Sequence, residues 1–460
     1  MLKDNLSKTV ELLAPAGNMQ AFLAAVNAGA DAVYMGLKTF NARVMTSNFE
    51  IDEYIYAIDY AHKRNVKVYL TLNTLLYDNE IEKALQDVIT LYNVGLDGII
   101  VQDLGFASVL RKALPDLPLH ASTQMSVCTL EQVRFLEKFG FTRVVLAREL
   151  SIDEIEYIVK NTKLEVEVFV HGALCVAVSG QCLMSALIGN RSANRGSCAG
   201  PCRKKYALCN TNGNVLVKEK YLLSKKDIFG LDKIEKLREI GVTSLKIEGR
   251  NKTEEYVAGV VESYRKVLNN GYDKHLDKDV LQLFNRSGKS AGYLGGVRYK
   301  DSISFNTAKN TGLVLGKVID TKKGYVKVRL EQDINMHDGI EIIGGISTIV
   351  TCIRDEKFNL VNALVKAGSI VWLGDVDKAK VSDTLYKTSD NMLNEKFKKY
   401  SALNLRKVTE NIKVVIKGNE EIYAVWNGAQ IKIECIPEQS KNALLTEDKI
   451  RQAFAIPKGK

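Results

Sequence analysis

Residues 10–36 read VELLAPAGNMQAFLAAVNAGADAVYMG, and this stretch decides the predicted fold. A short strand-like run at Glu11–Ala14 leads into a polar tip, and apolar residues then recur three to four apart over Met19–Ala28. That spacing is typical of an amphipathic helix. Gly29 follows the helix, as a helix-ending glycine does, and Ala32–Met35 begins a second run of strand formers. The stretch therefore predicts a strand, a helix and another strand.

The same unit recurs over the first 250 residues. Further strands are predicted at Val66–Leu72, Gly98–Val101, Leu119–Ala121, Arg143–Leu146, Val166–Val170 and Ser244–Ile247. Helical patterns between them include Asp52–Arg64, Ile81–Val94, Leu130–Phe139 and Ile152–Lys160. Eight strands alternating with helices over roughly 250 residues match a (β/α)8 barrel of the α/β class. A doubly wound open sheet is the alternative, because one sequence does not show closure.

Polar residues follow nearly every predicted strand. The C-terminal ends of barrel strands meet at one rim, which is where barrel active sites lie. We therefore predict a catalytic pocket lined by Gln124, Arg148, Glu149, Glu248 and Arg250. The alternative is that the charged members of this set form salt bridges on the rim.

The domain pattern changes after the barrel. We expect residues 1–270 to form the barrel, with a cysteine-rich insertion at about 171–243, and residues 271–310 to form a linker or packed loop. Residues 311–400 predict a small β-barrel, and residues 401–460 a β/α extension with strands near 411–436 and a helix at 446–455. The predicted small-barrel strands are Gly312–Ile319, Tyr325–Leu330, Gly339–Ile343, Ser347–Arg354, Val361–Val365 and Ile370–Leu373.

The insertion holds closely spaced cysteines. Six residues separate Cys175 from Cys182, fifteen separate Cys182 from Cys198, and three separate Cys198 from Cys202, while Cys209 follows. Such spacing in a chain without secretory features indicates a metal or an iron–sulfur cluster. Neighbouring arginines and lysines favour the ligating thiolate. The alternative is a set of buried, inert cysteines.

Basic residues surround these thiols. Between Arg191 and Lys226 the only acidic residue is Glu219, and the chain carries a formal net charge of +10. This pattern is compatible with an RNA partner, and a solvated charged face is the alternative. We predict that RNA binding involves Arg191, Arg195, Arg203, Lys204 and Lys205.

The N-terminal residues MLKDNLSKTVELLAP contain no apolar signal core, and no run of about 18 apolar residues occurs. We therefore expect a cytoplasmic protein that does not contact a membrane and keeps its thiols reduced. The sequence leaves the oligomeric state open.

Seven segments resemble peptidase family U32, the collagenase-like peptidases. The most telling is EVFVHGALCVAVSGQCLMS, at Glu167–Ser185. The others are ELLAPAGN (Glu11–Asn18), GADAVYMG (Gly29–Gly36), HASTQMSV (His120–Val127), RVVLAREL (Arg143–Leu150), NRGSCAGPCR (Asn194–Arg203) and SLKIEGR (Ser244–Arg250). FNRSGKSAGYLGG, at Phe284–Gly296, is similar to the branch of 23S rRNA 5-hydroxycytidine synthases, whose sister enzymes hydroxylate the wobble uridine of tRNA.

The resemblance implies a 4Fe–4S cluster and a prephenate-dependent, oxygen-independent C5 hydroxylation of a pyrimidine in RNA. Cytidine in 23S rRNA is the preferred target, and the tRNA wobble uridine is the next. Cys175, Cys182 and Cys198 match cluster positions. Cys202 is the preferred fourth ligand and Cys209 the other candidate, because Phe229 stands where many members have a cysteine.

Two other functions stay open. The family name suggests a collagenase-like peptidase, for which a Cys175–His171 pair is the one conceivable nucleophile and base. The second alternative is a non-catalytic RNA-binding or accessory protein.

Overall fold

The computed structural model describes residues 10–44, 46–296, 300–343, 345–376, 379–408, 413–417, 421–426, 429–433 and 446–449. The chain divides into two compact units, Met1–Arg406 and Lys407–Lys460, which are described separately. No helix among the described residues combines the length and apolar character needed to cross a bilayer.

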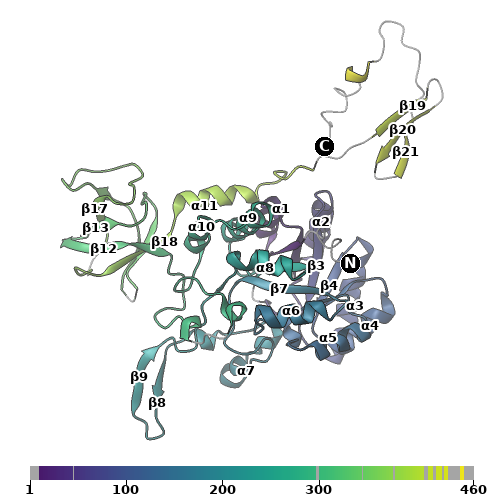
Figure 1. Ribbon diagram of the computed structural model, residues 1–460, viewed down its shortest axis with the longest axis horizontal. Helices are drawn as coiled ribbons and strands as arrows, with labels where there is room; N and C mark the ends of the chain where they lie inside the picture. Colours follow the sequence, from purple (N-terminus) through teal and green to yellow (C-terminus); the bar gives the residue numbers. More distant parts are fainter. Residues whose placement is uncertain are drawn as a thin grey trace. The chain divides into compact units, whose positions relative to one another are not determined.

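The first unit is built around a closed parallel barrel (Figure 1). Each strand pairs in parallel with the next, and the last pairs with both its predecessor and the first. The strands are β1 (Glu11–Pro15), β2 (Ala32–Met35), β3 (Lys67–Leu72), β4 (Gly98–Val101), β5 (Leu119–Ala121), β6 (Arg143–Val145), β7 (Glu165–Gly172) and β11 (Ser244–Ile247). The predicted (β/α)8 barrel is confirmed, and the open-sheet alternative is wrong.

Amphipathic helices form the outer wall of the barrel, and their apolar faces complete its core. Polar caps fix where several of them begin: the Asn18 side chain accepts from the Ala21 N–H, and Ser151 with Glu154 forms the predicted capping box. The wall helices are α1 (Met19–Asn27), α2 (Ile51–His62), α3 (Asp78–Asn93), α4 (Leu104–Ala113), α5 (Leu130–Phe139), α6 (Ile152–Lys160), α8 (Ile234–Glu239) and α9 (Glu254–Asn270).

A long excursion separates β7 from α8. It contains the short helix α7 (Met184–Gly189) and a hairpin of β8 (Tyr206–Cys209) and β9 (Val215–Lys220), which projects away from the barrel in Figure 1. The excursion then returns through β10 (Ile228–Phe229), which pairs antiparallel with the end of β7. Both ends of the excursion are therefore fixed at the C-terminal rim of the barrel.

A second sheet follows α10 (Leu276–Leu283) and encloses an apolar core of its own. The predicted small β-barrel is present as a seven-stranded antiparallel half-barrel in the order β15-β14-β18-β12-β13-β17-β16. Its strands are β12 (Leu313–Lys322), β13 (Tyr325–Leu330), β14 (Gly339–Glu341), β15 (Ser347–Ile349), β16 (Ile353–Arg354), β17 (Ile370–Gly374) and β18 (Thr384–Ser389).

The structure differs from the sequence prediction at several points in this region. The expected strand Ser347–Arg354 is divided into β15 and β16, and the expected strand Val361–Val365 forms only an isolated bridge from Val365 to Ile334. The sequence prediction missed β18, which lies between β12 and β14, and the helix α11 (Asn391–Lys398), which packs on α9.

The second unit contains three antiparallel strands in sequence order: β19 (Lys413–Lys417), β20 (Glu421–Trp426) and β21 (Ala429–Ile433). The structure describes only residues 446–449 of the helix expected at 446–455, and residues 447–449 are helical.

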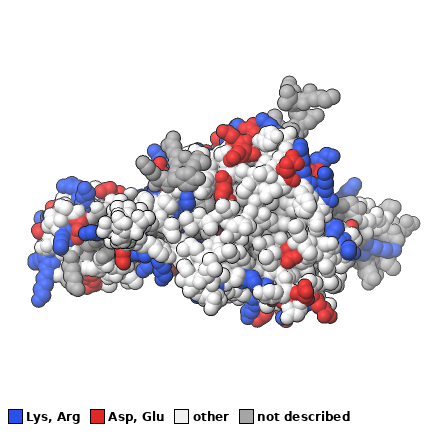
Figure 2. All heavy atoms as spheres, turned by 90° about the horizontal axis from the view of Figure 1, so that it is seen from below, with Lys and Arg blue, Asp and Glu red and all other residues white. Residues whose placement is uncertain are grey.

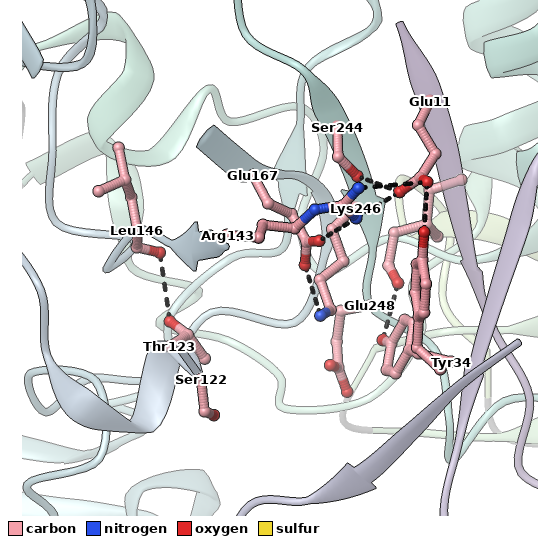
Figure 3. Close-up of polar contacts among 12 residues, drawn as sticks. Glu11, Tyr34, Ser122, Thr123, Arg143, Leu146, Glu167, Ser244, Lys246 and Glu248 are labelled. Atoms are coloured by element: carbon pink, nitrogen blue, oxygen red, sulfur yellow. Dashed lines mark hydrogen bonds and ion pairs between the residues drawn. The ribbon is translucent and has the colours of Figure 1, made fainter. Parts of the chain in front are cut away.

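The interior of the parallel barrel contains a buried ion network (Figure 3). Arg143 lies 2.6 Å from Glu11, 3.2 Å from Glu167 and 2.7 Å from Glu165. The Lys246 ammonium lies 2.6 Å from the other Glu167 oxygen. Burial would raise the pKa of Glu11, but Arg143 brings it below its ordinary value. Because buried charges are costly unless paired, each member of this network depends on the others.

We expect Arg143→Met to lower the free energy of unfolding by about 3–5 kcal/mol, because it leaves Glu11 and Glu167 buried without their partner. Denaturant unfolding followed by circular dichroism measures this. The control is Arg134→Met, which breaks an exposed pair with Glu131 and should cost less than about 1 kcal/mol. Equal losses in the two variants would contradict a coupled interior network.

Candidate functional site

A pocket opens at the C-terminal ends of the barrel strands. Every barrel strand except β1 contributes a lining residue from its end or from the loop that follows it. Four of the five predicted catalytic residues, Gln124, Arg148, Glu248 and Arg250, lie in this lining. The rest of the lining is Tyr34, Ala42, Arg43, Thr71, Asn73, Ile100, Ser122, Thr123, Phe169 and Lys246.

Glu248 is the one carboxylate in the lining. Arg43 lies 3.2 Å from one Glu248 oxygen, and Arg148 lies 3.9 Å from the other. Burial by itself would raise the pKa of Glu248, but Arg43, Arg148 and Arg250 bring it below the ordinary value for glutamate. Glu248 is therefore ionised at neutral pH, and an ionised carboxylate only accepts hydrogen bonds.

Arg250 is held rigidly beside it. Its guanidinium donates to the Thr71 hydroxyl at 3.0 Å and to the side-chain oxygens of Asn41, at 3.2 Å, and Asn48. Burial lowers the pKa of Arg250 to about 10, so the side chain remains a cation at neutral pH. A fixed guanidinium offers a planar pair of donors to an incoming carboxylate or phosphate.

Two cations that the sequence prediction missed complete the lining. Arg43 comes from the loop after β2, and Lys246 comes from the interior of β11, with its ammonium 4.4 Å from the Tyr34 ring centre. Burial lowers the pKa of Lys246, while Glu167 opposes that shift. The sequence offered a signal for Lys246: it is a charged residue in the strand of SLKIEGR, at a position where a buried strand is expected to carry an apolar residue. Four cationic side chains therefore surround one carboxylate.

Glu149 has a different place from the other four predicted residues. Its carboxylate accepts from the Ser179 N–H at 3.1 Å and from the Ser179 hydroxyl at 3.0 Å. Ser179 belongs to the cysteine-rich excursion, so Glu149 anchors that excursion and is absent from the pocket lining.

Two glycines let the excursion approach the rim closely. Gly180 and Gly196 both have positive φ. A Cβ on Gly180 would lie only 2.1 Å from the Gln124 carbonyl oxygen, and a Cβ on Gly196 only 2.4 Å from the Asn41 carbonyl oxygen. Only glycine combines this backbone conformation with such an approach. The excursion is therefore packed directly on two loops of the barrel mouth.

Cys175, Cys182, Cys198 and Cys202 all lie in the excursion, which packs on the barrel mouth. Burial raises the pKa of Cys202, Arg203 lowers it, and charge on Cys175, Cys198 and Cys182 raises it again. The Gly200 N–H points to the Cys198 sulfur at 3.3 Å.

Cys209 occupies a different position, at the end of β8 beside the hairpin turn. Phe229, where a relative's cysteine was expected, is buried in β10 against the His171 ring.

The cysteines of the excursion have the donor chemistry of an iron–sulfur cluster. A four-iron cluster takes four thiolates, one on each iron. The excursion supplies four cysteines, and a backbone N–H is directed at the sulfur of one of them, Cys198. Among the described residues, no three His, Cys, Asp or Glu side chains form a site for one metal ion.

The predicted RNA-binding residues fall into two groups. Arg191, Lys204 and Lys205 are exposed. Arg195 instead donates to the Leu75 carbonyl at 2.5 Å and pairs with Glu80 at 2.6 Å, tying the excursion to α3.

Arg203 is a second internal brace. Its guanidinium donates to the Leu174 carbonyl at 2.9 Å, to the Ser224 hydroxyl at 2.8 Å and to the Lys225 carbonyl. Leu174 immediately precedes Cys175, and Arg203 follows Cys202. The guanidinium therefore holds the two outer cysteines of the set together.

His171 does not pair with Cys175 in the described part of the chain. Its Nδ1 lies 3.2 Å from the Tyr264 hydroxyl, and burial lowers its pKa to about 3. The ring packs among Phe229, Tyr256 and Tyr264, so this histidine serves the core.

The family model described as "Peptidase family U32" matches residues 17–304, which include the barrel mouth and all four of these cysteines. The chain belongs to peptidase family U32.

Curated U32 relatives carry two kinds of name. The chain is 38% identical over 351 residues to the 23S rRNA 5-hydroxycytidine synthase of Escherichia coli (strain K12), a match that covers 73% of this chain and 53% of that protein. It therefore spans only about half the length of this relative. It is 35% identical over 359 residues to tRNA hydroxylation protein P1 of Bacillus subtilis (strain 168), covering 74% of this chain and 84% of that one. A Porphyromonas gingivalis protein named collagenase is 30% identical, covering 82% of this chain and 97% of that one.

We expect Arg203→Ala to loosen the excursion. Losing hydrogen bonds from a charged donor costs roughly 1.5–3 kcal/mol, which raises the open population by about 10- to 150-fold. Limited proteolysis at low protease concentration reports this population as faster cleavage between residues 174 and 226. The control is Arg191→Ala, which removes one exposed bond to the Ser197 carbonyl. Cleavage at the wild-type rate in Arg203→Ala would contradict the bracing role.

Proposed function

We propose that this U32 member is an RNA-modifying enzyme that hydroxylates C5 of a pyrimidine. Cytidine in 23S rRNA is the preferred target and the wobble uridine of tRNA is the next. The observation that carries the proposal is a barrel-mouth pocket with four cations and one carboxylate, against which the cysteine-rich excursion packs at Gly180. Relatives named for rRNA and tRNA hydroxylation support the same reaction class.

We assign a 4Fe–4S cluster to Cys175, Cys182, Cys198 and Cys202. When bound, such a cluster supplies one-electron redox chemistry. The protein's own part is to hold the thiols with Arg203, to direct the Gly200 N–H at the Cys198 sulfur, and to pack the excursion onto the rim. The exposure of Cys175 and Cys198 leaves a path for loading the cluster.

Prephenate is the proposed co-substrate, and its two carboxylates suit the charge of the pocket. Arg148, Lys246 and Arg250 supply the cations, and guanidinium groups bind carboxylates with paired hydrogen bonds. Arg148 also stacks over the Phe169 ring at 4.0 Å, which fixes the plane of its guanidinium.

The ionised Glu248 supports the preference for cytidine. C5 chemistry requires the base to leave the stack and enter a pocket. A carboxylate accepts a hydrogen bond from the cytosine N4 amine, whereas the uracil O4 at that position is itself an acceptor. Glu248 would therefore attract cytosine and disfavour uracil in the same pose.

Nucleoside mass spectrometry on rRNA and tRNA from a strain lacking this gene tests the function. We expect one 5-hydroxypyrimidine nucleoside to disappear, to return with the wild-type gene, and to remain absent with Cys175→Ser. Loss of 5-hydroxycytidine from 23S rRNA would support the preferred target, and loss of 5-hydroxyuridine from tRNA the other. Unchanged nucleosides, together with a purified protein that cleaves gelatin through Cys175, would establish the peptidase alternative.

We expect Arg148→Gln to weaken prephenate binding by about 10- to 150-fold, because one charged hydrogen-bonding partner is worth roughly 1.5–3 kcal/mol. Calorimetric titration of anaerobically purified protein measures the affinity, and an unchanged melting temperature shows that the barrel is intact. Arg191→Gln, which changes an exposed arginine of the excursion, should leave the affinity unaltered. An unaltered prephenate affinity in Arg148→Gln would contradict the proposal that prephenate binds in this pocket.

A further inference from the structure

The β8–β9 hairpin and the residues that lead into it, 204–220, form a projecting arm. The arm pairs only with itself in the described part of the chain, as a two-stranded sheet. Apolar side chains near its tip are exposed: 50% for Leu208, 58% for Val215 and 62% for Leu216. A lone two-stranded sheet gains little from its own packing, so exposed apolar side chains of this kind indicate a surface that is covered in the working state.

The arm is nevertheless well formed. In its turn, the Asn210 side-chain oxygen accepts the N–H groups of Asn212 and Asn214. At its base, the Tyr206 hydroxyl donates to the Pro201 carbonyl at 2.9 Å, and the Tyr221 N–H donates to the Phe305 carbonyl at 3.0 Å. The arm therefore has a defined shape, and its base is fixed close to Cys202 and Arg203.

The charge of the arm is strongly positive. Lys204, Lys205, Lys218 and Lys220 are exposed, against Glu219 as the one acidic residue. None of these lysines forms an ion pair with another described side chain, although Lys205 lies 5.7 Å from the Tyr221 ring. Figure 2 views the side from which the arm projects, where charged side chains mainly border a wide uncharged area.

We propose that the arm is a clamp for the substrate RNA. Its lysines neutralise backbone phosphates, and Leu208, Val215 and Leu216 pack against unstacked bases of the same RNA. This inference rests on the proposed function, since it assigns to the arm the RNA on which the barrel acts. Holding a base outside the stack costs free energy, and apolar side chains inserted beside it compensate for lost stacking.

Charge complementarity favours RNA over the other occupants of such a surface. Protein interfaces are depleted in lysine, whereas phosphate contacts are made largely by lysine and arginine. A second copy of the chain would bring an equally basic arm against the first, and like charges oppose that contact.

The test compares two quadruple variants that remove the same charge. The first is Lys204→Gln, Lys205→Gln, Lys218→Gln and Lys220→Gln. The control changes four exposed lysines of the barrel's helical side: Lys83→Gln, Lys112→Gln, Lys138→Gln and Lys163→Gln. Binding of purified 23S rRNA and of bulk tRNA, both from the deletion strain, is titrated separately as a function of salt. Each phosphate contact contributes about 0.7–0.9 to the slope of log K against log salt.

We expect the arm variant to reduce this slope by about 3 on the RNA that is modified, and the control to leave it within about 0.5 of the wild type. Prephenate affinity should be equal in both variants, which shows that the pocket is intact. A third variant, Leu208→Ser with Leu216→Ser, should keep the slope but lower the yield of hydroxylated nucleoside at least tenfold.

Equal slopes in the two quadruple variants would overturn the clamp. If the deletion strain still lacks its hydroxylated nucleoside in that case, the proposed function stands and only the role of the arm fails. Sedimentation that shows dimers of the wild type and monomers of the arm variant would instead assign the arm to contact between copies, which also overturns the proposal.

Discussion

The parallel pairing of β11 with both β7 and β1 is the constraint on which the rest of the structure depends. It closes the barrel and brings the end of the last strand against the loops that follow the first ones. Arg250 can then reach Thr71 and Asn41, and Glu248 can reach Arg43, although about 180 to 210 residues separate these partners in the sequence. Without closure, the pocket would not exist.

Closure also explains why charge can be buried inside this barrel. Arg143 and Lys246 each lie beside Glu167, a carboxylate contributed by a different strand. Such pairing offsets the loss of hydration only when geometry is fixed on all sides. The interior network therefore supports the pocket above it, because Lys246 belongs to both.

The excursion before β11 uses the same rim as its platform. Glu149 binds Ser179, two glycines permit close backbone contact, and Arg203 joins its two ends. These contacts fix the cysteine-rich excursion to the barrel mouth, and the hairpin projects outwards from it (Figure 1).

The amino-acid sequence by itself determined the order of the barrel strands and their bounds to within about two residues, because strand and helix periodicity are local properties. It also carried the signal for the hairpin in Asn212-Gly213, which we missed, since that dipeptide flanked by apolar residues favours a tight turn. It could not separate Glu149 from the other charged rim residues, or Arg195 and Arg203 from the exposed basic ones. Those distinctions depend on which side chains meet after the barrel closes, and only the tertiary structure decides them, because burial and pairing arise between residues far apart in the chain.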